Sequence, residues 1–175
     1  MTAGAGELRH HRPMAEQAGA GLDERWLAEA VELARRCFPS WSAFSVGAIV
    51  VGPDGVELAR SYSREAAPLD HAEEGALRKA AEAGLALDGA TVYSSIEPCG
   101  RRASRAAPCA RLIVEAGVAR VVYALGEPSI FVERSGDGLL RAAGVEVVVI
   151  DRLAAAAREV NAHLPGVEAA PGPGR

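Results

Sequence analysis

The chain has 175 residues, with 19 basic and 23 acidic side chains, a formal net charge of -4 and a hydrophobic content of 49%. This length suits one globular domain, and the hydrophobic content excludes an intrinsically disordered chain. The slightly acidic balance argues against a nucleic-acid partner, and no apolar run approaches the roughly 18 residues that a membrane span needs.

The predicted elements alternate between helices and strands. An arm over residues 1–21 has no apolar period, and Asp23 is predicted to cap a helix that ends before Pro39. Residues 46–51 and 56–62 predict two strands joined by a hairpin turn. Later segments are predicted as helices over 71–83, 108–116 and 138–143, strands over 90–96, 118–125 and 145–150, and a helix from Asp151 to about His163.

This order predicts an α/β fold. We expect a three-layer α-β-α sandwich, in which helices cover both faces of a mixed, mostly parallel sheet of five strands. The folded domain is predicted to span residues 22–163, followed by a disordered tail over 164–175 that is rich in proline and glycine.

Cysteine is scarce. Cys37, Cys99 and Cys109 are the three cysteines of the chain. An odd number, with no apolar N-terminal stretch of the kind that directs export, argues against a disulfide framework. We therefore expect a cytoplasmic protein whose cysteines serve another purpose.

Two short segments place metal-binding side chains where predicted strands end and helices begin. Asp70–Glu73 opens one helix, while Glu97–Cys99 ends a strand and Pro108–Cys109 opens the next helix. Open α/β sheets place their sites at the carboxyl ends of strands. Each segment alone has an ordinary interpretation, because His-x-Glu is common and two cysteines can be buried apolar side chains. Together, and beside helix starts, they predict a metal site.

The donor types favour zinc. His71, Cys99 and Cys109 are predicted to bind one zinc ion per subunit, which leaves a fourth tetrahedral position for water. Zinc lowers the pKa of its bound water to roughly 7, and Glu73 is the predicted general base that moves the water proton to the substrate. Residues i and i+2 of a regular helix do not share a face, so this prediction requires His71 to lie at the start of the helix.

These residues resemble the signature of the zinc-dependent nucleobase deaminases. The cysteines are separated by nine residues, and Arg105 stands upstream of Pro108 and Cys109. This spacing is similar to the deaminase domain of the riboflavin-biosynthesis deaminase–reductase family, in which Glu-Pro-Cys, an inserted loop and an Arg-x-x-Pro-Cys segment follow one another. The resemblance covers about residues 22–163.

The resemblance implies a cytidine deaminase-like fold and a reaction in which oxygen replaces an exocyclic amine of a pyrimidine, with release of ammonia. The implied substrate is a diaminopyrimidinone ribosylamine 5'-phosphate, and the implied assembly is a homodimer or homotetramer. The phosphate needs cationic contacts, which Arg105 and Arg101 or Arg102 can supply. The chain ends before any reductase domain, so we expect a deaminase that acts alone. The other candidate substrate-binding residues are Phe44, Ser45 and Glu97.

The substrate has a second interpretation. Residues 42–48 resemble the Ser-x-Phe-x-Val-Gly-Ala of cytidine deaminases, and Glu127–Ile130 replaces the Asp-Pro-Asn-Pro of the riboflavin family. A cytidine or deoxycytidylate deaminase is therefore the alternative within the enzyme class. An inactive, zinc-stabilised interaction module is a third possibility, against which Glu73 argues because a structural zinc site needs no such carboxylate.

Overall fold

The computed structural model describes residues 14–126, 136–165 and 167. Every predicted helix and strand is present, and most bounds differ from the prediction by a few residues. The elements in chain order are α1 (Met14–Ala34), β1 (Gly47–Val51), β2 (Glu57–Tyr62), α2 (Ala72–Glu82), β3 (Thr91–Ile96), α3 (Cys109–Glu115), β4 (Arg120–Leu125), α4 (Gly136–Ala142), β5 (Glu146–Val149), the 3-10 turn η2 (Asp151–Leu153) and α5 (Ala154–Val160).

The five strands form one mixed sheet in the order β2-β1-β3-β4-β5. β1 pairs antiparallel with both β2 and β3, whereas β3, β4 and β5 pair in parallel. β1 therefore runs against the other four strands. The carboxyl ends of β2, β3 and β4 meet at one edge, and α2 and α3 start just beyond it.

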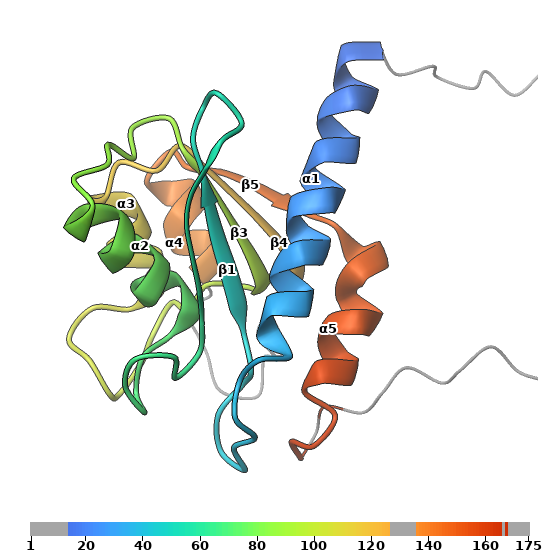
Figure 1. Ribbon diagram of the computed structural model, residues 1–175, viewed down its shortest axis with the longest axis vertical. Helices are drawn as coiled ribbons and strands as arrows, with labels where there is room; N and C mark the ends of the chain where they lie inside the picture. Colours follow the sequence, from blue (N-terminus) through green and yellow to red (C-terminus); the bar gives the residue numbers. More distant parts are fainter. Residues whose placement is uncertain (1–13, 127–135, 166, 168–175) are drawn as a thin grey trace, which may run out of the picture.

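Helices cover both faces of the sheet, which confirms the three-layer prediction (Figure 1). α2, α3 and α4 pack on one face around a core that includes Val92, Ile113 and Leu140. α1 and α5 pack on the other face, where Leu27 and Ile49 are fully buried. None of the described helices is long and apolar enough to cross a membrane.

α1 begins earlier than the sequence predicts. The helix starts at Met14, so residues 14–21 are helical and not part of a disordered arm. These residues are mostly alanine, glutamate and glutamine, whose intrinsic propensity favours a helix without an apolar period. Asp23 consequently lies inside the helix and caps nothing: its carboxylate accepts hydrogen bonds from the Tyr93 hydroxyl at 2.8 Å and from Arg120 at 2.7 and 2.8 Å.

The C-terminal segment also departs from the prediction. Asp151 opens the turn η2, and Leu153 is the N-cap of α5. The turn is needed because Ile150 still donates to the Tyr123 carbonyl of β4 and the chain must then reverse toward α1. Leu164 and Val167, which fall in the predicted tail, are buried. Residues 1–13, 127–135, 166 and 168–175 lie outside the described residues, and these include the Glu127–Ile130 segment considered above.

Candidate active site

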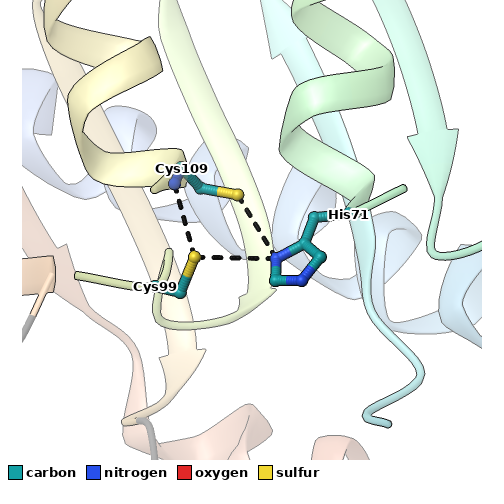
Figure 2. A group of neighbouring side chains, drawn as sticks. All are labelled: His71, Cys99 and Cys109. Atoms are coloured by element: carbon teal, nitrogen blue, oxygen red, sulfur yellow. Dashed lines mark hydrogen bonds between the residues drawn. The ribbon is translucent and has the colours of Figure 1, made fainter. Parts of the chain in front are cut away.

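Three soft donor atoms meet at the carboxyl edge of the sheet. His71 Nδ1 lies 3.4 Å from Cys109 Sγ and 3.6 Å from Cys99 Sγ, and the Cys109 amide donates to Cys99 Sγ at 3.3 Å (Figure 2). The three ligand atoms lie within 4.8 Å of one another. Among the described residues, this is the one group of three histidine, cysteine or acidic side chains arranged closely enough to hold a metal ion.

Local backbone geometry explains this convergence. His71 is the N-cap of α2 and has an extended conformation (φ -86°, ψ 156°), so it precedes the regular helix. This conformation meets the requirement raised by the His71-x-Glu73 spacing, and both side chains line one cavity. Pro108 is the extended N-cap of α3, which makes Cys109 the first residue of that helix, while Cys99 follows the end of β3.

The donor set fits zinc. Ligand distances of roughly 2.0–2.3 Å in a tetrahedral zinc site separate neighbouring donor atoms by about 3.3–3.8 Å. The distances from His71 Nδ1 to the two sulfur atoms, 3.4 and 3.6 Å, lie in this range before any rearrangement. Cys109 is fully buried and Cys99 is nearly so, which leaves little of either residue exposed to bulk solvent.

The three donors perturb one another electrostatically. A hydrogen bond from the Cys109 side chain, with further help from His71, lowers the pKa of Cys99 well below its usual value. The same contact and burial raise the pKa of Cys109. Burial lowers the pKa of His71, but the hydrogen bond with Cys99 and the Glu73 carboxylate outweigh burial and raise it. One thiolate is therefore already stabilised by its neighbours.

Glu73 is a buried carboxyl beside this group. Its side chain comes from the first turn of α2, the residue is 3% exposed, and Oε1 lies 2.8 Å from the Ser94 hydroxyl on β3. Burial raises the pKa of Glu73, because a charged carboxylate is poorly solvated there. A raised pKa suits a group that accepts and returns a proton near neutral pH.

A cavity of about 460 Å³ opens onto these residues. His71, Glu73 and Cys99 line it, together with Phe44 and Glu97. Its volume falls in the range of roughly 300–1,000 Å³ that is typical of small-molecule sites. The site thus combines three side chains that could hold a metal ion, a buried carboxyl and room for a small substrate.

The predicted substrate residues take different places around this cavity. Phe44 and Glu97 line it, and Glu97 Oε1 accepts a hydrogen bond from the Asp137 amide at 2.8 Å. Ser45 is buried behind the wall, where its amide donates to Asn161 Oδ1 at 2.7 Å. Its hydroxyl accepts from the Arg64 guanidinium at 3.2 Å.

The arginines of the segment between the two cysteines are arranged unequally. Arg102 lines the cavity, and its guanidinium pairs with Glu74 at 2.9 Å, with the side chain 3% exposed. Arg105 does not line the cavity itself, but it pairs with the lining residue Asp70 at 2.9 Å and with Glu74 at 3.4 Å. Arg101 is exposed and does not belong to the lining either. The ion pairs fasten this segment onto the start of α2.

Sequence reasoning missed three side chains that support the site. Ser94 contacts Glu73, while Arg64 and Asn161 hold the segment that carries Phe44. Arg64 donates to the carbonyls of Phe44 and Phe38, both at 2.9 Å. No sequence signal distinguished Ser94, because β3 carries the adjacent serines Ser94 and Ser95 and both are buried.

The comparisons with known proteins agree with this geometry. The family model described as the cytidine and deoxycytidylate deaminase zinc-binding region matches residues 21–125. The chain belongs to this family. It is 40% identical to the diaminohydroxyphosphoribosylamino-pyrimidine deaminase of Schizosaccharomyces pombe over 132 residues, which are 74% of this chain and 32% of that protein. The chain spans about a third of the length of the curated relatives it matches.

Solved deaminase structures share the fold. The Rib2 deaminase of Aspergillus oryzae in complex with DARIPP matches with a TM-score of 0.74 and 26% identity, over 84% of this chain and 94% of that chain. The dCMP deaminase of cyanophage S-TIM5 matches with a TM-score of 0.59 and 26% identity, over 74% of this chain and 98% of that chain. The two structures are equally identical to this chain in sequence, but the fold of this chain is more similar to the Rib2 deaminase than to the cyanophage dCMP deaminase.

Proposed function

We propose that this chain is a zinc-dependent hydrolytic deaminase of riboflavin biosynthesis, and that its substrate is a diaminopyrimidinone ribosylamine 5'-phosphate. The observation that carries the proposal is the meeting of the His71, Cys99 and Cys109 donor atoms beside a cavity that is lined by His71, Cys99 and the buried carboxyl of Glu73. Family membership and the likeness to the Rib2 deaminase support it. The reaction exchanges a ring C–NH2 for C=O, consuming one water molecule and releasing ammonia.

His71, Cys99 and Cys109 would hold the metal in this proposal. When bound, zinc supplies a Lewis acid that makes water a nucleophile at neutral pH. The backbone amides at the start of α3 favour a thiolate over a thiol, and the Cys109 amide already donates to Cys99 Sγ. The protein thus contributes two sulfur donors and one imidazole nitrogen, which are held at the ends of three separate elements.

Glu73 carries the protons. It takes one from the attacking water and delivers it to the ring nitrogen next to the reacting carbon, and it moves a second from the new hydroxyl to the departing amine. The carbon–nitrogen bond then breaks, ammonia leaves and the carbonyl forms. Burial suits Glu73 to this task, since its raised pKa brings the carboxyl closer to neutrality than an exposed glutamate.

The cavity lining indicates which arginines could contact the phosphate of the substrate. Of the arginines suggested by the sequence, Arg102 is favoured over Arg101 and Arg105 because it lines the cavity. Arg64 is a second cationic side chain in the lining, and its contacts include two backbone carbonyls and the Ser45 hydroxyl. Phe44 and Glu97 are the proposed contacts to the pyrimidine ring.

A cytidine or deoxycytidylate deaminase remains the second candidate, because residues 42–48 carry the cytidine deaminase-like pattern and the cyanophage dCMP deaminase shares the fold. An ammonia-release screen separates the two. The purified zinc-loaded chain is offered cytidine, dCMP, guanine and the riboflavin precursor, with and without its phosphate. Preferred turnover of the phosphorylated precursor is expected; preferred turnover of cytidine or dCMP would instead establish the second candidate.

The role of Glu73 has its own test. Glu73→Gln preserves the size of the side chain but removes the base, and it should lower kcat by about 10²- to 10⁴-fold while one zinc ion per chain is retained. Zinc content by mass spectrometry and the melting temperature serve as controls. Ammonia release at the native rate would contradict the catalytic assignment and leave the interaction-module interpretation.

We propose the cytoplasm as the location and a homodimer or homotetramer as the assembly. The three cysteines are free thiols, which suits a reducing compartment. Phe38 and Trp41 are 78% and 87% exposed beside the cavity, and exposed apolar side chains of this size support a subunit contact. Light scattering on the zinc-loaded chain measures the assembly.

A further inference from the structure

A buried serine contacts the carboxyl of Glu73 from the neighbouring layer. Ser94 belongs to β3 and is fully inaccessible to solvent. Its Oγ lies 2.8 Å from Glu73 Oε1 and 2.7 Å from the backbone carbonyl oxygen of Ile96. The hydroxyl therefore lies between two oxygen atoms, one from the side chain of α2 and one from its own strand.

The chemistry of a hydroxyl suits this position. A serine has one hydrogen to donate and two lone pairs with which to accept, whereas the Ile96 carbonyl only accepts. When Glu73 is a carboxylate, Ser94 donates to Oε1. The Ile96 carbonyl is the second acceptor within reach of that hydrogen.

The contact also fixes the direction of a long side chain. Glu73 has three rotatable side-chain bonds, and a carboxylate that swings by about 1 Å can lose on the order of 100-fold in rate. An alanine at position 94 would fit in the space of the serine but would leave Oε1 without its partner from β3. Packing alone therefore does not account for the serine.

We propose that Ser94 is a positioning residue, which holds Glu73 by Oε1 so that Oε2 faces the proton transfers of the reaction. This inference rests on the proposed role of Glu73. Ser94 touches no reacting atom and acts only through that carboxyl. The requirement is for a hydroxyl at this position of β3 and not for a serine as such.

The test compares two neighbouring serines. Ser94→Ala should lower kcat by about 10- to 100-fold, with KM changed less than about twofold and one zinc ion per chain. Ser95→Ala is the matched control: Ser95 is equally buried, but its hydroxyl accepts from the Gly47 amide at 3.1 Å and does not contact Glu73. Its kcat should stay near that of the parent chain.

Further measurements separate positioning from folding. Ser94→Thr retains the hydroxyl and should recover most of the kcat that Ser94→Ala loses. Ser94→Cys is closer to serine in size than threonine is, but its thiol is a weak donor, so it should recover little. In a Glu73→Gln background, Ser94→Ala should leave the residual rate unchanged, because its effect passes through Glu73. A double-mutant cycle on the free energy of unfolding should show coupling between positions 73 and 94 without any reference to activity.

The outcomes are distinct. Full kcat in Ser94→Ala, or an equal loss in Ser95→Ala, would overturn the inference while the proposed function stands. A loss of kcat that follows loss of zinc or of folded protein would also overturn it. If the parent chain releases no ammonia from any of the screened substrates, the proposed function fails and the inference fails with it.

Discussion

At the scale of single residues, the site depends on polar side chains that satisfy one another in the core. Asn161 is fully buried near the end of α5, yet it serves the cavity wall 116 residues earlier in the chain. Its Oδ1 accepts from the Ser45 amide at 2.7 Å, and its Nδ2 donates to the Ser45 carbonyl at 3.0 Å. The Asn161 side chain therefore makes the two hydrogen bonds to the Ser45 backbone that a neighbouring strand would otherwise make. These bonds fix the segment next to Phe44.

We expect Asn161→Leu to destabilise the fold by roughly 2–4 kcal/mol, because it leaves the buried amide and carbonyl of Ser45 without partners. The mutation should also raise KM more than it lowers kcat, since the wall moves and the metal donors do not. Urea denaturation and steady-state kinetics measure the two effects. Glu159→Gln, at an exposed position of the same helix, should stay within about 0.5 kcal/mol. Unchanged stability in Asn161→Leu would contradict this account.

The sequence predicted which donor-type side chains come together but not the residues that support them. His71, Cys99 and Cys109 were predictable as a group because these residue types are scarce, His71 and Cys109 stand at helix starts, and Cys99 follows a strand. Ser94 and Asn161 were not, because their partners lie 21 and 116 residues away and serine and asparagine are common in ordinary loops. The sequence also could not predict which arginine lines the cavity, because the positions of Arg102 and Arg105 depend on their ion pairs with Glu74 and Asp70.

At the scale of elements, close packing sets the position of α1 over the sheet. A side chain added at Gly47 of β1 would place its Cβ 2.1 Å from the Ala30 carbonyl oxygen and 2.7 Å from the Ala34 amide. The helix thus lies directly against the strand. Asp23 adds a polar connection to β3 and β4 through Tyr93 and Arg120. The strands were predictable from their β-branched runs, whereas the start of α1 follows local propensity alone.

Two glycine substitutions test this packing. Gly47→Ala should destabilise the protein by about 1–3 kcal/mol or more, because the obstructing atoms belong to the backbone and cannot rotate away. Gly19→Ala in α1 meets no atom within 4 Å and should stabilise it by about 0.5–1 kcal/mol through helix propensity. Thermal and urea unfolding of both variants measure the difference. Equal effects of the two substitutions would show that α1 tolerates displacement from β1.

At the scale of the whole molecule, the donors connect segments that are distant in the chain. His71 begins α2, Cys99 follows β3 and Cys109 begins α3, and these elements pack around a single core. A metal that binds this arrangement and not the unfolded chain stabilises the fold in proportion to the logarithm of its concentration over its dissociation constant. Metal binding and the folding of the region formed by α2, β3 and α3 should therefore be coupled.

Removal of zinc tests this coupling. Treatment with a chelator should lower the melting temperature, and returned zinc should restore it. The free energy of unfolding should rise by about 2.7 kcal/mol when free zinc is 100 times the dissociation constant. The pKa values of His71 and Cys109 are raised, so protons compete with the metal there, and apparent zinc affinity should fall as the pH falls. Competition with a coloured chelator at several pH values between about 8 and 6 measures the trend.

Two cysteine variants provide the control. Cys109→Ser should weaken zinc binding at every pH. Cys37→Ser should leave the zinc affinity unchanged, because Cys37 is a buried cysteine whose Sγ contacts the Val46 carbonyl. A melting temperature insensitive to the chelator, in protein shown to have lost its zinc, would separate the metal from the stability of the fold.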